Sequence, residues 1–361
     1  MAANPFVHYR DRLDSYAAAR AGGLSDERFV DLVGRLDAAV ARVDGRGFVI
    51  TPTVEMPALA AAAGLDAHLH VKVEVDSVGG SHKARHLMGV AIQMLVDEAL
   101  GAEPQGVLAI ASCGNAAIGA SVIARAMDRP LQVFVPAWAD PPVIEQLTEI
   151  GADLRVCERQ SGEAGDPCYL RFSEAVAAGA RAFSVQGTDT PSAFDGGRTI
   201  GWELADQAPG LDAVYIQVGG GALATATSMG LGDVALFPVQ AEGCAPLRRA
   251  WDLLAPDFDF AAAATNPTAY MWPWEDEPSS IASGILDDVT YDWQPLLQRT
   301  RATGGEPIVA TEATTLRAFE LARAETDILV SATGSAGLAG PLTVAPSGGR
   351  IAVLFTGIDR G

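Results

Sequence analysis

The chain has 361 residues, of which 49% are hydrophobic and 19% charged, as in an ordinary globular protein with one large α/β unit or two lobes. The net charge of −20 argues against a nucleic-acid partner, because binding to phosphate backbones needs basic patches. The first residues lack a basic start and an apolar core, and no apolar stretch reaches about 18 residues, so we expect no secretory signal, no membrane partner and a cytoplasmic location. The four cysteines are widely spaced, which favours a reducing compartment over a disulfide framework.

The hydrophobic pattern predicts an α/β fold. Residues 1–50 are predicted to be mostly helical, with Ser25 as the cap of a helix whose apolar positions continue to Val40. Further along, predicted strands (residues 69–75, 106–111, 131–135, 153–156, 182–185, 214–218 and 351–355) alternate with predicted helices (85–100, 116–127, 143–150 and 222–229). Such alternation indicates a largely parallel sheet with helices on both faces, and ligands of such folds bind at the carboxyl ends of strands.

A lysine with unusual neighbours is the first candidate for chemistry. Lys83 follows Gly79, Gly80 and Ser81, in a small-residue loop predicted just before a helix. Small residues allow a ligand to approach closely, and a lysine amine forms a Schiff base with a carbonyl cofactor. The alternative is a solvated surface lysine.

Two more motifs follow predicted strands. The triple glycine at residues 219–221 precedes a helix-forming run, so its N–H groups are suited to phosphate oxygens, unless it is only a tight turn. The spacing of these glycines does not fit the common nucleotide-binding loops.

The second motif runs from Ser112 to Asn115. Asn115 is a candidate donor to a cofactor ring oxygen, and the N–H groups after Ser112 are candidates for binding a carboxylate. The alternative for this motif is a simple helix cap. A lysine, an asparagine and a phosphate loop in this order indicate pyridoxal phosphate as the cofactor.

Other features carry weaker signals. His82 and His86 could share a helix face, but a metal would need a third ligand and the sequence offers none, so we expect no metal. Cys113 is either a reactive thiol near a helix start or a small packing residue. Residues 257–285 are the least regular part and form either an ordered surface loop or part of an active-site wall.

The motifs together resemble those of the tryptophan-synthase-β superfamily, the fold type II pyridoxal-phosphate enzymes, and within it threonine synthase and the threonine/serine dehydratases. The resemblance covers nearly the whole chain from about residue 45. Residues 81–85 resemble the family's Ser-Phe-Lys-x-Arg element, and residues 112–115 resemble Ser-x-Gly-Asn. Residues 195–204 and 218–223 resemble the stretch before the phosphate loop and the loop itself, and residues 354–357 resemble the closing Leu-Thr-Gly of threonine synthases.

The resemblance implies a role for each matching residue. The resemblance implies that Lys83 is the catalytic lysine that forms the Schiff base. The other implied cofactor-binding residues are Asn115, Gly219, Gly220, Gly221, Ala222, Leu223 and Thr356, whose hydroxyl would face the pyridine nitrogen, with Thr333 and Ser335 as fallbacks. The implied substrate-binding residues are Ser81, Arg85, Ser112, Cys113, Gly114 and Ala116. Arg85 either binds an anionic group of the substrate or forms a structural ion pair.

The sequence also departs from the family pattern. His82 replaces the phenylalanine, Ala84 the acid that commonly follows the lysine, Ala222 the fourth loop glycine, and Ser331 with Ala332 the Glu-Pro pair. Ala84 weakens the threonine-synthase interpretation in particular.

The resemblance implies two three-layer α/β/α lobes with mostly parallel sheets. We expect a large cofactor-binding domain of residues 1–90 and 190–361, in which residues 1–50 form a helical extension, and a small mobile substrate domain of residues 91–189. A homodimer is the family expectation.

The expected function is a pyridoxal-phosphate-dependent lyase, of the carbon–oxygen or carbon–nitrogen type, that eliminates or replaces a β-substituent on a small polar amino acid, as serine and threonine dehydratases do. One alternative is a threonine synthase-like γ-replacement on a phosphorylated amino acid. Another is a non-catalytic ligand-binding α/β protein.

Overall fold

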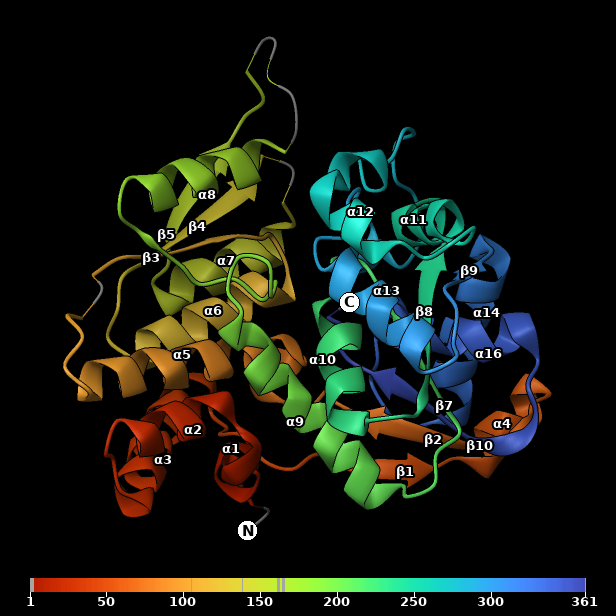
Figure 1. Cartoon of the computed structure of the whole chain (residues 1–361), viewed down its shortest axis with the longest axis horizontal. Coiled ribbons are helices and arrows are strands. Elements are labelled where there is room, and N and C mark those ends of the chain that lie inside the picture. Colours follow the sequence, from red (N-terminus) through yellow and green to blue (C-terminus); the bar gives the residue numbers. More distant parts are fainter. Residues whose placement is uncertain (1–2, 105, 138, 161–162, 164–165, 361) are drawn as a thin grey trace. The chain divides into compact units, whose positions relative to one another are not determined.

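The computed structural model describes residues 3–104, 106–137, 139–160, 163 and 166–360, so the first two residues of the predicted helical extension lie outside the described part. The chain forms two compact units (Figure 1). Unit 1 consists of Met1–Ile50 and Ser77–Thr199, and unit 2 of Thr51–Asp76 and Ile200–Gly361. These bounds differ from the predicted domains, since residues 1–50, 77–90 and 190–199 belong to the unit that contains residues 91–189.

Unit 1 contains a four-stranded parallel sheet with the order β5-β4-β3-β6. Its strands are β3 (Leu108–Ala111), β4 (Leu131–Pro136), β5 (Asp153–Cys157) and β6 (Arg181–Ala182). Its helices are α1 (Pro5–His8), α2 (Asp14–Ala21), α3 (Asp26–Asp44), α5 (Lys83–Ala99), α6 (Asn115–Ala126), α7 (Pro141–Ile150), α8 (Pro167–Ala177) and the first half of α9 (Ser192–Gln207). Helix α8 covers one face of the sheet and α6 the other (Figure 1).

The N-terminal helices belong to unit 1 because specific hydrogen bonds hold them there. The carboxylate of Asp195 accepts hydrogen bonds from the first two backbone N–H groups of α2, those of Asp14 at 2.9 Å and Ser15 at 3.1 Å. Arg198 pairs with Asp14 at 2.6 Å. These contacts join residues about 180 positions apart, which no local sequence pattern predicts.

Helix α5 packs very closely against two other helices of unit 1. A Cβ atom at Gly89 would collide with the backbone of Gly196 in α9, and one at Gly196 would collide with the carbonyl of Arg85. On α6, a Cβ at Gly119 would lie 3.2 Å from the Cα of Ala84. Glycine at these positions lets the backbones approach and fixes the start of α5.

Unit 2 contains a six-stranded sheet with the order β1-β2-β10-β7-β8-β9, in which only the β1–β2 pair is antiparallel. Its strands are β1 (Thr53–Glu55), β2 (Asp66–Val73), β7 (Ala213–Gln217), β8 (Ala235–Ala241), β9 (Ile308–Ala310) and β10 (Ser347–Phe355). Its helices, besides the second half of α9, are α4 (Pro57–Ala63), α10 (Ala222–Leu231), α11 (Pro246–Leu254), α12 (Phe260–Thr265), α13 (Trp293–Ala302), α14 (Glu312–Glu325), α15 (Ala332–Ser335) and α16 (Ala339–Val344).

Both faces of the second sheet are buried. Along β7, Val214 and Ile216 contribute to one hydrophobic core, together with residues of α10, α11 and α13. Ala213 and Tyr215 contribute to the other core, together with residues of α4, α14 and α16. The predicted α/β fold with mostly parallel sheets is confirmed.

Some predicted boundaries were wrong. Helix α5 begins at Lys83, so this lysine lies in the first turn of the helix and not in a loop before it. A strand was predicted at residues 182–185, whereas strand β6 consists of residues 181 and 182. Strands β8 and β9 were not predicted, and the irregular stretch 257–285 contains α12 and two short 3₁₀ turns.

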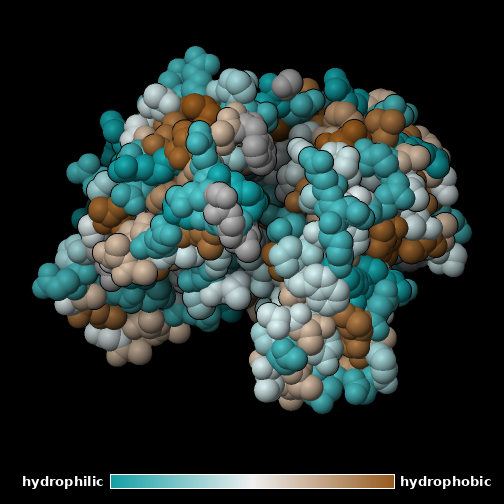
Figure 2. Space-filling model, turned by 90° about the horizontal axis from the view of Figure 1, so that it is seen from above, coloured by the Kyte–Doolittle hydropathy of each residue, from teal (hydrophilic) through white to brown (hydrophobic). Residues whose placement is uncertain are grey.

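The surface is mixed in polarity. Figure 2 shows hydrophobic residues in small groups between hydrophilic ones. The most exposed large hydrophobic side chains include Val156 and Leu329, and single exposed apolar residues of this kind are normal. Among the described residues, no helix combines the length and the apolar character needed to cross a bilayer.

A fully buried ionic cluster lies in unit 2. Lys72 of β2 donates from Nζ to Glu203 of α9 and to the carbonyl of Thr51, each at 2.6 Å. The Thr51 hydroxyl donates to Glu74, and its backbone N–H donates to Glu203 at 3.0 Å. Lys72, Glu74 and Glu203 have no exposed surface. The ammonium therefore compensates the buried carboxylate of Glu203.

Lys72→Met should destabilise the protein strongly, because it leaves the buried carboxylate of Glu203 without its cation. We expect the free energy of unfolding to fall by about 3–5 kcal/mol, measured by urea denaturation followed by circular dichroism. The double variant Lys72→Met/Glu203→Leu should recover more than half of that loss. A loss below about 1 kcal/mol in the single variant would show that the pair does not carry this role.

Candidate active site

Lys83 is the side chain that the burial pattern at the start of α5 singles out. Between Ser81 and Ile92 every residue is buried except Lys83, which is half-buried at the first position of α5. The hydroxyl of Ser81 accepts the backbone N–H of Lys83 at 3.4 Å. The start of the helix thus holds one amine at the border between the core and solvent.

The lysine count strengthens this assignment, and our sequence reasoning missed it. The chain has two lysines, Lys72 and Lys83. Lys72 is fully buried and paired with Glu203 at 2.6 Å. Lys83 is therefore the lysine whose Nζ can meet a ligand.

The neighbours of Lys83 serve packing. Ala84 is fully buried against Gly119 of α6, so the acid that commonly follows the lysine would have no room there. Arg85 is the largest fully buried side chain among the described residues, and its guanidinium donates to the Thr199 hydroxyl at 3.2 Å and the Val49 carbonyl at 3.3 Å. These contacts favour the structural alternative for Arg85, and its substrate-binding role stays a prediction.

His86 is held neutral. Its Nδ1 lies 2.9 Å from the carbonyl of Ala193, which can only accept, so Nδ1 carries the hydrogen and Nε2 is an acceptor. The pKa of His86 is lowered to about 3, first by burial and then by the positive charges of Lys83 and Arg85, while the bond to Ala193 acts in the opposite direction. His82 packs edge-on against His86, with ring centroids 6.0 Å apart.

The second motif of unit 1 links β3 to α6. Residues 111–115 are half-buried, and Ala116, the next residue, is buried. The Ser112 hydroxyl accepts the N–H of Gly114 at 3.4 Å. Gly114 is the N-cap of α6 and has no side chain to cap the first N–H groups. Helix α6 begins at Asn115 and passes Ala84 one turn later, at Gly119, so the starts of α5 and α6 lie together in unit 1.

The glycine loop of unit 2 links β7 to α10. Gly221 is the N-cap of α10 at a φ of 99°, which favours glycine. A Cβ at Gly219 would collide with Asp287 and would lie 3.0 Å from the Cα of Ile285. The Gly220 carbonyl accepts the N–H of Asp292 at 2.9 Å. Residues 285–292 thus hold the loop in place. Ala222 and Leu223 form the buried first turn of α10.

A buried hydroxyl accompanies this loop. Thr290 is fully buried, and its methyl group lies 3.2 Å from where a Cβ of Gly221 would be. Its hydroxyl has no hydrogen-bond partner in the part of the chain that the structure describes. A buried polar group without a partner is rare in folded proteins and is consistent with a ligand oxygen at this position.

Thr356 follows β10 in unit 2, and Gln217 holds it. The Gln217 Nε2 donates to the Thr356 hydroxyl oxygen at 2.7 Å and to the Gly334 carbonyl at 2.7 Å. Since the hydroxyl oxygen accepts this bond, its own hydrogen is directed elsewhere. Our sequence reasoning missed Gln217, although a lone glutamine at the end of an apolar strand was the signal. The fallback residues are engaged locally, because Thr333 accepts from Gly284 at 2.9 Å and Ser335 donates to Ser331 at 3.0 Å.

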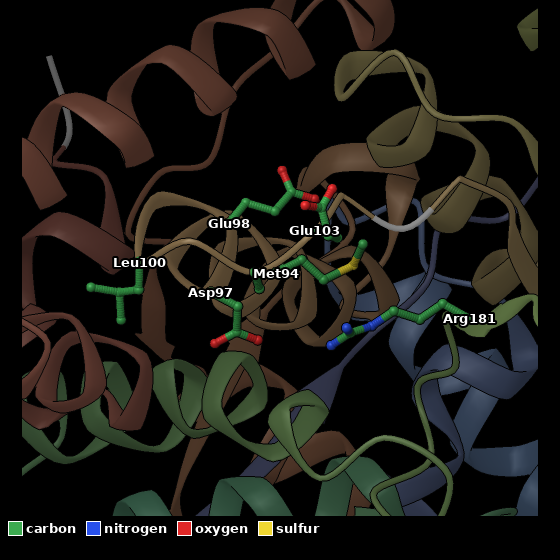
Figure 3. Close-up of a pocket in the computed structure, with 7 residues that line it drawn as sticks. Met94, Asp97, Glu98, Leu100, Glu103 and Arg181 are labelled. Carbon is green, nitrogen blue, oxygen red and sulfur yellow. The ribbon is translucent and has the colours of Figure 1, made fainter.

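One cavity of unit 1 lies away from these motifs. Met94, Asp97, Glu98, Leu100, Ala102, Glu103 and Arg181 line a space of about 310 Å³ (Figure 3). Met94 is eleven residues after Lys83 in α5, or roughly 16 Å along the helix axis. Glu98 pairs with Arg129 at 2.8 Å. Among the described residues, no group of three or more His, Cys, Asp or Glu side chains could hold a metal ion.

The comparison with known families decides the cofactor. A model of pyridoxal-phosphate-dependent enzymes matches residues 46–357. The chain belongs to this family. It is 25% identical to serine racemase from Bos taurus over 304 residues, 84% of each chain. It is 28% identical to L-threonine ammonia-lyase from Thermotoga maritima over 166 residues, 45% of this chain and 38% of the relative.

Solved structures support the fold. The processed form of threonine deaminase isoform 2 from Solanum lycopersicum matches with a TM-score of 0.69 at 16% identity. The match covers 93% of this chain and 91% of that chain. The expected resemblance to fold type II pyridoxal-phosphate enzymes is thereby confirmed.

Each unit contains groups of the kind that pyridoxal phosphate needs. The cofactor needs an amine for its aldehyde and N–H or hydroxyl donors for its phosphate. Unit 1 contains the amine of Lys83. Unit 2 contains the glycine N-cap of α10 and the Thr290 hydroxyl, which are groups suited to a phosphate.

The neutral state of His86 predicts a pH dependence of stability. Because its folded pKa of about 3 lies below the ordinary value of 6.5, the unfolded chain binds the additional proton between these values. Stability is complete above about pH 6.5 and is lost as the pH falls toward 3. Relative to His86→Gln, the wild type should lose about 1–2 kcal/mol between pH 7 and pH 5, measured by urea denaturation. Parallel pH profiles of the two proteins would contradict the neutral buried state.

Proposed function

We propose that the protein is a pyridoxal-phosphate-dependent lyase that eliminates the β-hydroxyl of a small hydroxy amino acid such as serine or threonine. The observation that carries the proposal is the half-buried position of Lys83 at the start of α5, in a chain with one other lysine. That other lysine is buried in an ion pair. The names of the relatives, which act on serine or threonine, support the substrate class.

Lys83 has two tasks in this proposal. When bound, pyridoxal phosphate supplies an aldehyde that condenses with amines and a ring that stabilises negative charge on the α-carbon. Lys83 Nζ would hold the cofactor through its aldehyde and would become a free amine when a substrate amine binds in its place. The same Nζ then takes the α-proton and returns a proton to the departing β-hydroxyl, which leaves as water. Hydrolysis of the released product gives a keto acid and ammonia.

Residues 112–116 are proposed to hold the substrate carboxylate. The start of α6 offers N–H groups that the glycine N-cap leaves without a capping side chain, and the helix dipole favours an anion there. Ser112 adds a hydroxyl, and Asn115 is proposed to donate to the ring oxygen of the cofactor. Fixing the carboxylate orients the α-proton toward Lys83.

Residues 219–223 are proposed to hold the cofactor phosphate. Thr356 is proposed to face the pyridine nitrogen, since the bond from Gln217 fixes the position of its hydroxyl at the end of β10. A hydroxyl is a neutral partner and does not enforce a protonated ring. This favours elimination or replacement over reactions that need a fully developed electron sink.

A second function, amino-acid racemisation, is favoured by the similarity to serine racemase. Racemisation shares the removal of the α-proton by Lys83 but returns a proton to the opposite face of the α-carbon, and the hydroxyl stays in place. A γ-replacement of the threonine synthase kind is less well supported, because Ala84 is packed against Gly119 where an acid is expected. A homodimer in the cytoplasm stays a prediction.

Lys83→Ala should keep the fold and lose the covalently bound cofactor. We expect the visible absorbance of the bound cofactor at roughly 410–420 nm to disappear. Borohydride treatment should then leave no cofactor on the chain by mass spectrometry. Lys72→Arg is the matched control, because it removes the other lysine while keeping its charge, and it should retain the adduct. An adduct that persists in Lys83→Ala would place the bond elsewhere.

Incubation with a panel of serine, threonine and their enantiomers separates the two functions. For a lyase, we expect keto acid and ammonia to form in equal amounts from a β-hydroxy amino acid. For a racemase, the opposite enantiomer should accumulate, with deuterium from D₂O at the α-carbon by NMR. A cofactor-loaded protein that changes no member of the panel would contradict the substrate class.

A further inference from the structure

His86 lies one turn after Lys83 in α5. Side chains three residues apart share a face of a helix, and helical side chains lean toward the N-terminus. Consistent with this, the ring of His86 contacts that of His82 at 6.0 Å between centroids and 81° between planes. The imidazole of His86 therefore lies over the first turn of α5, which carries Lys83.

The orientation of this ring is fixed. Its Nδ1–H donates to the carbonyl of Ala193 in α9, and Gly89 and Gly196 bring α5 and α9 into close contact. Nδ1 is thus occupied, and Nε2 is the atom that remains for another contact.

Nε2 of His86 is a buried acceptor without a donor in the described part of the chain. The side chain has no exposed surface, so solvent does not satisfy this atom. Buried acceptors without a donor are rare, and an ordered water, a ligand or a transient state of the protein can supply the missing hydrogen.

We propose that His86 is a positioning residue whose Nε2 lone pair accepts a hydrogen bond from the Nζ ammonium of Lys83. The proposal rests on the proposed role of Lys83 as the base of the reaction. The charged groups around His86, Lys83 and Arg85, are both positive, and burial further opposes protonation, so His86 offers its lone pair and does not compete for the proton.

The proton balance of the step is simple. The α-carbon–hydrogen bond breaks, its electron pair stays with the substrate, and the proton forms a third N–H bond at Lys83 Nζ. One N–H of the resulting ammonium donates to His86 Nε2. The bond stabilises the ammonium and holds it until it releases a proton to the leaving hydroxyl.

The two lysines make a direct test possible. Full-length protein labelled with [ε-¹³C]lysine and freed of cofactor should give two side-chain NMR signals, and Lys83→Ala assigns them. In His86→Leu, which removes the acceptor, the midpoint of the Lys83 titration should fall by about 0.5–1 pH unit, because the ammonium loses its partner. His86→Gln keeps an acceptor oxygen and should restore the midpoint. Lys72 serves as the internal reference.

The kinetic readout uses the loaded enzyme. His86→Leu should lower kcat roughly 10-fold with little change in KM, and His86→Gln should recover most of the loss. Equal losses in both variants, or an unchanged titration of Lys83 in His86→Leu, would overturn the proposal.

Two further outcomes keep the inference distinct from the proposed function. If the wild type forms no cofactor bond at Lys83, the proposed function fails, while the titration still tests the contact between the two side chains. If His86→Leu does not fold, ¹⁵N-histidine spectra of the wild type and Lys83→Ala replace it. The Nε2 signal of His86 should shift when the donor is removed at a pH where Lys83 is protonated, and an unchanged signal would overturn the contact.

Discussion

The close approach of helices in unit 1 is the constraint on which the candidate chemistry depends. Gly119 brings α6 against Ala84, and Gly89 with Gly196 brings α9 against the next turn of α5. With neighbours on these sides, nearly every side chain at the start of α5 is buried, and Lys83 is the exception. Backbone contacts, which side-chain motion does not alter, therefore fix the helix start from which the Lys83 side chain extends.

Backbone groups explain how a chain with a strongly negative net charge can bind an anionic cofactor. The net charge is −20, and one of the two lysines is committed to a buried pair with Glu203. Backbone N–H groups at the glycine N-caps of α6 and α10 supply partial positive charge without basic side chains. Membership of the family explains why the motifs occur at these positions in the sequence. The starts of α6 and α10 explain how an anion can be bound at the motifs without basic side chains.

The sequence predicted what is local. Alternating strands and helices led to the α/β fold, and strand ends located the loops at Asn115 and Gly219. The domain bounds depended on bonds such as that between Asp195 and the start of α2, which no local pattern records. Gln217 was read as part of an apolar strand because its role depends on Thr356, which lies 139 residues away. The scarcity of lysine was readable from the sequence, but the burial of Lys72 was not.

The residues next to Lys83 that depart from the family pattern act on the same property, the charge environment of the lysine amine. The packing of Ala84 against α6 leaves no space for an acid, so a carboxylate is not available there to balance an ammonium at Lys83. Arg85, two positions further along α5, adds a buried positive charge. A neutral acceptor is the remaining way to stabilise the ammonium without trapping its proton. His86, with its tautomer fixed by Ala193, has the chemistry that this environment requires.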